Sequence, residues 1–221
     1  MSLDAQEIAD AAVGLALELS ALQSQTLARY VALLSRWNTV HNLTAIDSSA
    51  DVLTHHLLDS LALLPHIQDL GGPRASRVLD VGSGGGFPGI PLAIGAPDLH
   101  ITLVDKVQKK VAFLVQAKLE LGLTNVNCVH ANVKDLQPQA SFDLIVARAF
   151  ASLSELVRLT RHLITPRGFW CAMKGVRPDA EIEALRVSAP GVRLVDAIAL
   201  HVPGLDAQRH LIVLQLPARS A

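Results

Sequence analysis

Apolar side chains near the N-terminus recur at the spacing of an α-helix. Positions three and four apart lie on one helix face, and one such series is Leu27, Tyr30, Val31, Leu34 and Trp37. The same spacing predicts an earlier helix from Val13, Ala16, Leu17 and Ser20. We therefore expect at least two helices before residue 40.

A further helical stripe follows a loop that we expect around His41 to Ser49. This helix is predicted from Asp51 to Leu64, with its apolar side chains at Leu53, Leu57, Leu61 and Leu64. Pro65 is expected to end it, because proline lacks the backbone N–H that a helix interior requires.

The pattern changes at the break "GGPR", Gly71 to Arg74. We place a domain boundary there, between a helical N-terminal extension (1–70) and a second domain (71–221). Short apolar runs beyond it predict strands at Arg77–Val81, Ile101–Val104, Val126–Val129, Leu144–Ala147, Phe169–Met173, Val192–Val202 and His210–Leu216. Helical segments between them are predicted at Pro88–Ile94, Gln108–Leu121, Leu153–Leu163 and Pro178–Val187, with Gly122 ending the second.

Strands that alternate with helices predict an α/β fold with a doubly wound, mostly parallel sheet covered on both faces. The last two predicted strands are joined by too few residues for a crossover helix. We expect them to pair antiparallel at an edge of the sheet.

Composition indicates a soluble globular protein without a global basic field. Half of the residues are apolar and the formal net charge is −1, so any polyanionic partner has to be met by a local patch. The two cysteines, Cys128 and Cys171, lie in strand-like runs without metal-binding spacing, and we interpret them as reduced core thiols. An acidic N-terminus and the lack of a long apolar run favour a cytoplasmic location, with no membrane and no metal involved.

The stretch "VLDVGSGGGFPGIPLAI" (Val78–Ile94) lies at the first strand-to-helix turn, where doubly wound sheets bind ligands. Glycine allows a ligand to approach the backbone closely, and Gly82 and Gly84 are the candidates. Asp105 ends the second predicted strand, 21 residues after Gly84, where a carboxylate accepts hydrogen bonds from ribose hydroxyls. The competing interpretation of Asp105 is an N-cap of the next helix.

Two nucleotide cofactors fit this stretch. Gly84-x-Gly86-x-x-Gly89 matches the dinucleotide fingerprint, although Pro88 falls inside it. The acidic residue in Asp80-x-Gly82-x-Gly84 suits S-adenosylmethionine better, because the amino acid end of that molecule requires carboxylate acceptors as well as amide donors. We favour S-adenosylmethionine as the cofactor.

Several separated stretches resemble the bacterial small-subunit rRNA guanine-N7 methyltransferases (the RsmG or GidB family). The resemblance extends from about Leu27 to Leu216. It rests on "RWNTVHNLTAI" (36–46), "HHLLDSL" (55–61), "DVGSGGGFPGIPLAI" (80–94), "ARAFASL" (147–153), "KG" (174–175) and "RHLIVL" (209–214).

This resemblance implies a class I methyltransferase (Rossmann-like) fold and an enzyme that methylates N7 of a specific guanine in 16S rRNA, with a small-subunit particle as partner. The cofactor contacts it implies fall on Gly82, Phe87, Val133, Lys134 and Arg148. Lys134 departs from the family, which usually has an acidic residue there. The departure is harmless if backbone groups hold the adenine, and it puts adenine recognition in doubt if a carboxylate does.

The sequence fits N7 chemistry through what it lacks. Guanine N7 carries a lone pair and no proton, so attack on a methyl group requires no general base, and we expect no catalytic base. The Pro-Pro-aromatic motif of exocyclic-amine methyltransferases is missing after the fourth predicted strand, where "VARAFASL" stands. A Pro-Cys nucleophile is also missing.

Arg148 follows the fourth predicted strand, beside Phe150. Its guanidinium can hold the cofactor carboxylate or a phosphate, and we favour this over a salt bridge to Asp80 or Asp143 because an arginine between apolar segments requires a partner. Phe150 either stacks on an extruded base or packs in the core.

Basic side chains at the predicted carboxyl-end rim are candidates for rRNA phosphate contacts: Lys106, Lys109, Lys110, Lys174 and Arg177. Arg158 and Arg161 are interpreted as a solvated face. His56 and Asp59, three residues apart, are interpreted as a structural hydrogen-bonding pair, and a metal site shared by His55 and His56 is not favoured, because adjacent helical residues point to different sides.

Two other classes of function remain as alternatives. A methyltransferase-like module that binds rRNA during assembly without turnover has the same motifs. An NAD-dependent oxidoreductase fits the formal fingerprint, but the sequence offers no candidate pair for hydride transfer.

Overall fold

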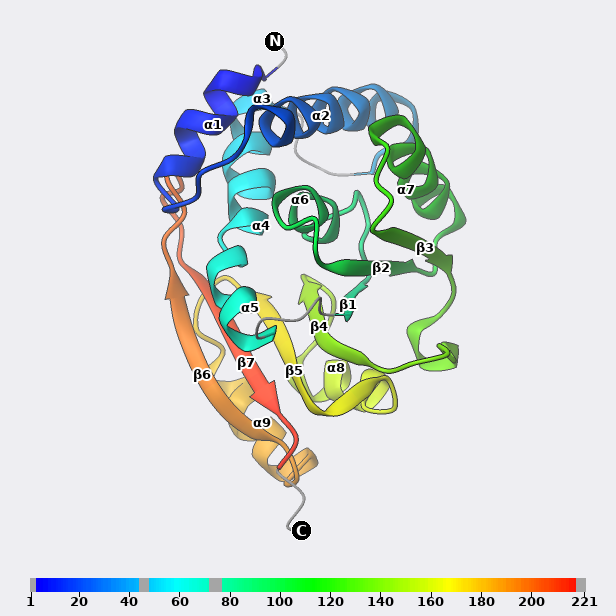
Figure 1. Cartoon of the computed structure of the whole chain (residues 1–221). Helices are drawn as coiled ribbons and strands as arrows, with labels where there is room; N and C mark the ends of the chain where they lie inside the picture. The colour runs from blue at the N-terminus through cyan, green and yellow to red at the C-terminus, as the bar shows by residue number, and fades with distance from the viewer. Residues whose placement is uncertain (1–2, 44–47, 72–76, 218–221) are drawn as a thin grey trace.

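The computed structural model describes residues 3–43, 48–71 and 77–217. Its centre is a seven-stranded sheet with the order β3-β2-β1-β4-β5-β7-β6, and helices cover both faces (Figure 1). The strands are β1 (Arg77–Val81), β2 (His100–Asp105), β3 (Val126–His130), β4 (Phe142–Arg148), β5 (Ile164–Lys174), β6 (Arg193–Leu200) and β7 (Arg209–Gln215).

The sheet has the predicted doubly wound, mostly parallel topology. Strands β1 to β5 pair parallel to their neighbours, while β7 pairs antiparallel with both β5 and β6. This confirms the antiparallel edge pair. All seven predicted strands are present, and β5 is longer than predicted because it begins at Ile164, before a register shift against β4.

The helices of the second half lie close to their predicted positions. They are α6 (Gly89–Gly95), α7 (Gln108–Leu121), the short 3-10 helix η2 (Val133–Asp135), α8 (Leu153–Thr160) and α9 (Asp179–Ser188). Gly122 ends α7 as predicted, with a left-handed φ of 67°, and its N–H donates to carbonyls of the last turn. A side chain is strained in that conformation, which explains glycine there.

The N-terminal helices differ more from the prediction. They are α1 (Ala5–Val13), α2 (Ala21–His41), α3 (Ser49–Asp51), the π-helix η1 (Val52–Leu58), α4 (Asp59–Leu61) and α5 (Leu64–Gly71). The predicted helix through Val13 to Ser20 is wrong, because the chain turns at Gly14 and Ala16 has a left-handed φ of 55°. Ser20 is instead the N-cap of α2, where it forms a capping box with Gln23.

The segment from Asp51 to Leu64 is also not one regular helix. It widens into the π-helix η1 and then turns at residues 62–63 before α5 begins. Pro65 does not end a helix there, since it lies in the first turn of α5, where a missing N–H leaves no hydrogen bond unmade.

Two apolar cores lie on opposite faces of the sheet. Helices α8 and α9 pack Leu156 and Ile182 against Trp170 of β5 on one face. On the other face, α6 and α7 share a core with α2 and η1, which contribute Leu27 and Leu57. The N-terminal helices therefore complete one core of the sheet.

Some predictions fall outside the described residues or stay untested. Residues 72–74 of the "GGPR" break and residues 44–47 of the expected loop lie outside them, and the domain division at residue 70 stays a prediction. Cys128 lies in β3 and Cys171 is fully buried in β5. Within the described part of the chain, no helix is both long and apolar enough to cross a membrane.

Candidate functional site

The glycine loop after β1 requires backbone conformations that side chains disfavour. Gly82, Gly84 and Gly86 have φ angles of 71°, 58° and 96°, all left-handed. The N–H groups of Gly82 and Ser83 donate to the carbonyl of Val104, at 2.9 and 3.3 Å, which ties the loop to β2. The loop therefore turns sharply at the carboxyl end of β1 and leaves its backbone open to a ligand.

Asp80 lies beneath this loop and does not line a cavity. It is fully buried, and its Oδ2 accepts a hydrogen bond from the Gly89 N–H at 3.1 Å, while its Oδ1 has no partner among the described residues. Burial raises the pKa of Asp80 to about 7, against the lowering effects of the Gly89 N–H and the Arg148 charge. Asp80 thus connects β1 to the start of α6.

Asp105 joins the loop to the segment that leads into α7. Its Oδ2 accepts from the Gly84 N–H at 3.0 Å and its Oδ1 accepts from the Val107 N–H at 2.8 Å. The alternative of an N-cap does not hold, because Val107 occupies the N-cap position of α7. Each carboxylate oxygen retains a second lone pair for a ligand.

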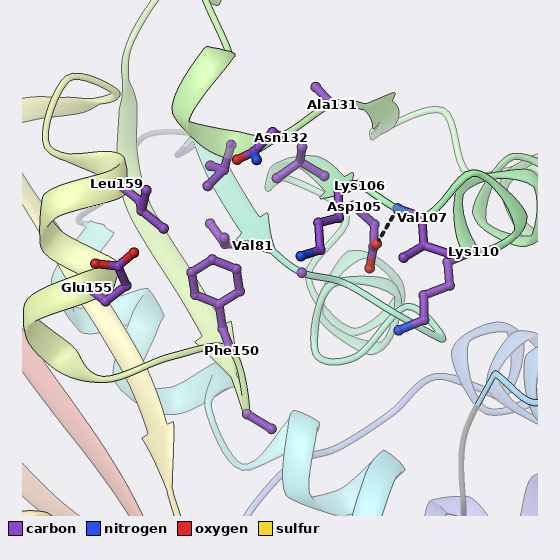
Figure 2. A pocket seen from close by; sticks show the side chains of 14 residues that line it. Val81, Asp105, Lys106, Val107, Lys110, Ala131, Asn132, Phe150, Glu155 and Leu159 are labelled. Atoms are coloured by element: carbon purple, nitrogen blue, oxygen red, sulfur yellow. Dashed lines mark hydrogen bonds between the residues drawn. The ribbon is translucent and has the colours of Figure 1, made fainter.

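A cavity of about 430 Å³, here called the first cavity, opens at the carboxyl ends of β1, β2 and β4 and beside η2 (Figure 2). It is lined by Val81, Gly82, Val104, Asp105, Lys106, Val107, Lys110, Ala131, Asn132, Val133, Ala149, Phe150, Glu155 and Leu159. Figure 2 shows Asp105 and Lys110 on one side, and Glu155 and Leu159 of α8 on the other.

Phe150 forms part of the wall of this cavity. A Cβ atom added to Gly82 would lie 2.9 Å from Cδ2 of Phe150, so the ring rests on the glycine. The ring is half-buried and packs at the edge of the core. Both interpretations, core packing and contact with a ligand, are compatible with this position.

The structure brings together some of the predicted site residues and separates others. Gly82, Asp105 and Val133 line the first cavity, as do Lys106, Lys110 and Phe150 of the predicted RNA-contacting group. The remaining predicted residues do not line it: Asp80, Gly84, Phe87, Lys134, Arg148, Lys109, Lys174 and Arg177.

Several of these residues have other contacts. Phe87 is buried against Tyr30, with ring centroids 5.4 Å apart. Lys109 donates to the carbonyl of His41 at 2.8 Å, and Arg177 forms an ion pair with Asp179 at 2.8 Å.

Lys134 is exposed. Its backbone N–H donates to the side chain of Asn132 at 3.3 Å, and its own side chain lies outside the cavity lining.

Asn132 and Glu155 line the first cavity and are absent from the predicted set. Both have a signal in the sequence, since Asn132 follows β3 as the N-cap of η2, and Glu155 lies one turn into α8 after the N-cap Ser152. Glu155 pairs with the exposed Arg158, and this pair lowers the pKa of its carboxyl. Exposure of Arg158 and Arg161 matches the predicted solvated face.

A second cavity, of about 440 Å³, lies beside the first, and Ala149 lines both. Its lining is His55, His56, Asp59, Arg148, Ala149, Met173, Lys174, Gly175 and Arg209. Ala149 has a left-handed φ of 50°, unusual for a residue with a side chain. The two cavities therefore meet at a strained turn after β4.

Asp59 links two arginines in the second cavity. Its Oδ2 accepts from Nη1 of Arg148 at 3.2 Å and its Oδ1 accepts from Nε of Arg209 at 3.0 Å. Arg148 is thus paired with Asp59, not with Asp80 or Asp143. Burial raises the pKa of Asp59, and the two guanidinium charges act against this.

The predicted pairing of His56 with Asp59 is wrong, since these arginines take the carboxylate. The His56 ring instead contacts the carbonyl of His55 at 3.0 Å and stacks on Phe87 with centroids 4.7 Å apart. Burial and, to a smaller extent, the charge of Arg148 lower the pKa of His56 to about 4. His56 is therefore neutral near pH 7.

Lys174 at the end of β5 holds the turn between the cavities. Its Nζ donates to both carboxylate oxygens of Glu181, at 2.9 and 3.0 Å, and to the carbonyl of Ala151 at 2.9 Å. Glu181 also accepts from the Leu153 N–H at 2.8 Å. Within the described residues, no three potential ligands are grouped in a way that could hold a metal ion.

Comparison with known proteins identifies related sequences. The family described as rRNA small subunit methyltransferase G matches residues 23–212. A Ralstonia nicotianae protein named ribosomal RNA small subunit methyltransferase G is 52% identical over 212 residues, covering 94% of this chain and 93% of the relative. Its namesake from Laribacter hongkongensis is 51% identical over 202 residues, covering 91% and 93%.

Solved structures with the same fold are more distant in sequence. The glycopeptide N-methyltransferase MtfA has a TM-score of 0.60 at 12% identity, covering 72% of this chain and 90% of that chain. The ribosomal protein L11 methylase from Lactobacillus delbrueckii subsp. bulgaricus has a TM-score of 0.54 at 16% identity, covering 72% and 76%. These similarities confirm the class I methyltransferase (Rossmann-like) fold.

Proposed function

The chain belongs to the rRNA small subunit methyltransferase G family, and on that premise we propose that it transfers the methyl group of S-adenosylmethionine to N7 of a guanine in 16S rRNA. The observation that carries the proposal is the first cavity, where the glycine loop and Asp105 meet at the carboxyl ends of the strands. Relatives named as methyltransferases support S-adenosylmethionine over a dinucleotide as the cofactor.

The residues of the first cavity fit this cofactor. A volume of about 430 Å³ is within the range of pockets that hold molecules of this size. Gly82 presents backbone without a side chain, and Asp105 offers its remaining lone pairs to the ribose hydroxyls. When bound there, S-adenosylmethionine supplies an electrophilic methyl group on a positively charged sulfur.

The adenine end is assigned to Asn132 and Val133. Val133 offers an apolar surface, and the Asn132 side chain is held by the Lys134 N–H. Because the side chain of Lys134 is exposed, recognition by backbone groups makes the departure from the usual acidic residue harmless. Asp80 and Gly84 support the site indirectly, by holding the loop through Gly89 and Asp105.

Methylation at guanine N7 requires no general acid or general base from the protein. Guanine N7 attacks through a lone pair that carries no proton, so no side chain has to remove one. The chain contributes by aligning guanine N7 with the methyl group and by keeping other nucleophilic atoms of the RNA away from it. Phe150, which rests on Gly82 in the cavity wall, is placed to orient the base.

Substrate RNA approaches from the rim that carries Lys106 and Lys110. These two lysines have no ion-pair partner within the described ranges, so their charges are available to phosphates. A formal net charge of −1 provides no general attraction to RNA. We therefore propose a folded small-subunit particle as the substrate, because it presents the target with a defined shape.

Transfer of a radiolabelled methyl group tests the proposal directly. The protein is incubated with labelled S-adenosylmethionine and small-subunit particles from cells that lack the modification, with large-subunit particles as the control. Label is expected only in 16S rRNA. The RNA should be cleaved at a single labelled site under conditions that break the chain at 7-methylguanine. Label at another atom or in large-subunit RNA contradicts it, and cofactor binding without transfer supports an assembly module instead.

A further inference from the structure

We propose that Tyr30 of α2 is a positioning residue for the cofactor, because it holds the glycine loop in the shape against which S-adenosylmethionine lies. The proposal rests on the proposed function for the identity of the cofactor, and it deepens that function by giving the N-terminal helices a part in cofactor binding. Tyr30 lines neither cavity. It therefore acts on the ligand through the loop and not by touching it.

The contact between α2 and the loop is a buried hydrogen bond. The Tyr30 hydroxyl donates to the carbonyl of Gly85, 55 positions further along the chain. Tyr30 is fully buried, and Gly85 is buried as well. No other hydrogen bond to this carbonyl is present among the described residues. Because water does not reach the carbonyl, loss of the hydroxyl leaves it unpaired unless the loop moves.

Helix α2 approaches the back of the loop so closely that side chains have no room there. A Cβ atom added to Gly86 would lie 2.9 Å from Oη of Tyr30 and 2.5 Å from Cδ1 of Ile90. One added to Gly85 would lie 3.3 Å from Cδ1 of Leu34, which is one turn from Tyr30 on α2. The need for glycine at these two positions therefore arises from the protein behind the loop.

The front of the same loop faces the first cavity. Gly82 lines this cavity, and the Gly84 N–H is held by Asp105, which lines it too. Gly84 and Gly85 are consecutive in the chain, so a movement at the back of the loop reaches the front. Asp105 and Tyr30 therefore hold one short backbone segment from two sides, the first from β2 and the second from α2.

The Tyr30 side chain is held in place by aromatic neighbours. Its ring centroid lies 5.4 Å from that of Phe87 and 6.4 Å from that of Phe113. Burial raises the pKa of Tyr30 well above its ordinary value. The hydroxyl therefore keeps its proton and remains a hydrogen-bond donor near neutral pH.

Tyr30→Phe removes the hydroxyl and keeps the ring, so it tests the hydrogen bond alone. The Gly85 carbonyl then has no donor, and the loop leaves the shape that fits the cofactor. We expect the dissociation constant for S-adenosylmethionine, measured by calorimetry, to rise about tenfold. Cooperative urea unfolding of the variant verifies that two folded proteins are compared.

Thr26→Val is the matched control, because it removes a buried hydroxyl from the same helix. The Thr26 hydroxyl donates to the Leu22 carbonyl at 2.7 Å, within α2, and not to the loop. The affinity for S-adenosylmethionine should stay within about twofold of the wild type. An equal loss of affinity in Tyr30→Phe and Thr26→Val, or an unchanged affinity in Tyr30→Phe, overturns the proposal.

Steady-state kinetics separate a positioning role from a loss of folded protein. The KM for S-adenosylmethionine should rise about tenfold in Tyr30→Phe, while kcat at saturating cofactor stays within about twofold, because bound cofactor restores the loop. A variant that is only less stable has fewer active molecules, which lowers kcat and leaves KM unchanged. This second pattern contradicts the proposal.

Hydrogen exchange without the cofactor keeps this test separate from the proposed function. Amide hydrogens of residues 82–90 should exchange about tenfold faster in Tyr30→Phe, and those of α9, on the other face of the sheet, at the wild-type rate. A wild type that binds S-adenosylmethionine more tightly than Tyr30→Phe but methylates no rRNA contradicts the proposed function alone. An active wild type whose cofactor affinity and loop exchange are both unaffected by Tyr30→Phe contradicts the positioning role alone.

Discussion

Two aspartates at and behind the first cavity act by holding the backbone of the glycine loop. Asp105 accepts from Gly84 and Val107, and Asp80 accepts from Gly89, so two carboxylates fix both ends of the glycine loop. Gly84 has open space around it, since a Cβ added there would meet no atom closer than 3.8 Å. What requires glycine at this position is its left-handed φ, and not a lack of room among the protein atoms.

Replacement of Gly84 by valine should therefore damage the loop through the backbone. A β-branched side chain is strongly disfavoured at a φ of 58°, and a shift of the loop breaks the bond from the Gly84 N–H to Asp105. We expect the affinity for S-adenosylmethionine to fall at least about tenfold in calorimetry. Gly122→Val is the control, because Gly122 has a φ of 67° outside the cavity. It should lower stability and leave the affinity unchanged, and unchanged affinity in Gly84→Val refutes the assignment.

Asp80 should make stability depend on pH. Its folded-state pKa, about 7, is raised above the ordinary value for a carboxyl. The folded protein therefore binds a proton more tightly than the unfolded chain, and the contribution of Asp80 to stability is lost as pH rises from about 4 to 7.

Asp80→Asn removes this titration while retaining an acceptor for the Gly89 N–H. Between pH 4 and pH 8 the stability of the variant relative to the wild type should improve by at least about 1 kcal/mol, measured by urea unfolding. Asp98→Asn, at an exposed position, is the control and should give a pH-independent difference. If the difference in free energy of unfolding between Asp80→Asn and the wild type stays constant across this pH range, the pKa of the Asp80 carboxyl is not raised.

At the scale of elements, the ends of helices and strands carry the site. Strands β1, β2 and β4 end at the first cavity, and β4, β5 and the start of β7 bound the second. Helix ends are held by side chains from other elements, such as Glu181 of α9, which accepts from the first N–H of α8. The cavities thus have walls fixed by contacts between elements far apart in the chain.

Gln23 provides one such contact between α2 and α6. Its side chain accepts from the Ser20 N–H and donates to the carbonyls of Ile94 and Gly95 at 3.0 Å, where α6 ends. Gln23→Ala should lower the free energy of unfolding by about 1–2 kcal/mol, because it removes a cap and leaves partly buried carbonyls unpaired. Gln116→Ala is the control, because the half-buried Gln116 of α7 bonds only within its own helix, to Glu120 at 2.8 Å, and it should change this free energy by less than about 0.5 kcal/mol. Equal urea midpoints for the two variants contradict this role.

In the molecule as a whole, the N-terminal helices and the sheet share one apolar core. Leu27 and Leu57 lie in the same apolar core as Ile90 of α6 and Phe113 of α7, on the face of the sheet that these two helices cover. The predicted boundary at residue 70 therefore separates two segments that share one apolar core. We propose that residues 1–70, although they precede the first strand of the sheet, are required for the stability of its core.

A chain that begins at residue 71 should accordingly fail to fold. Such a chain exposes to water the apolar face that α2 and η1 cover. The lost burial of apolar area removes a large part of the free energy that stabilises the fold. We expect a loss of cooperative urea unfolding, followed by the near-ultraviolet circular dichroism of Trp170, and recovery on addition of residues 1–70 as a separate peptide. Cooperative unfolding of the fragment alone shows instead that the domain is autonomous.

The fold class and the family could both be predicted from the order of residues along the chain. Apolar runs of strand length alternating with helical stripes predicted all seven strands, and the glycine loop with Asp105 predicted a nucleotide site at the first turn. These features are local or depend on a fixed spacing, so they are readable from the order of residues alone. The π-helix and the place of Pro65 were not predicted, because packing against the sheet decides how a short helical segment is wound and where it turns.

The partners of the charged side chains, in contrast, could not be predicted and follow from the folded arrangement of the strands and helices. Arg148 and Arg209 lie 89 and 150 positions after Asp59 in the sequence, and no periodicity relates the three residues. Their pairing arises because Asp59, the first residue of α4, lies against Arg148 at the end of β4 and Arg209 at the start of β7, two strands that only β5 separates in the sheet. Arg148 and Lys174 line the second cavity and not the first. A partner chosen across a sheet depends on topology, which the spacing of residues along the chain does not contain.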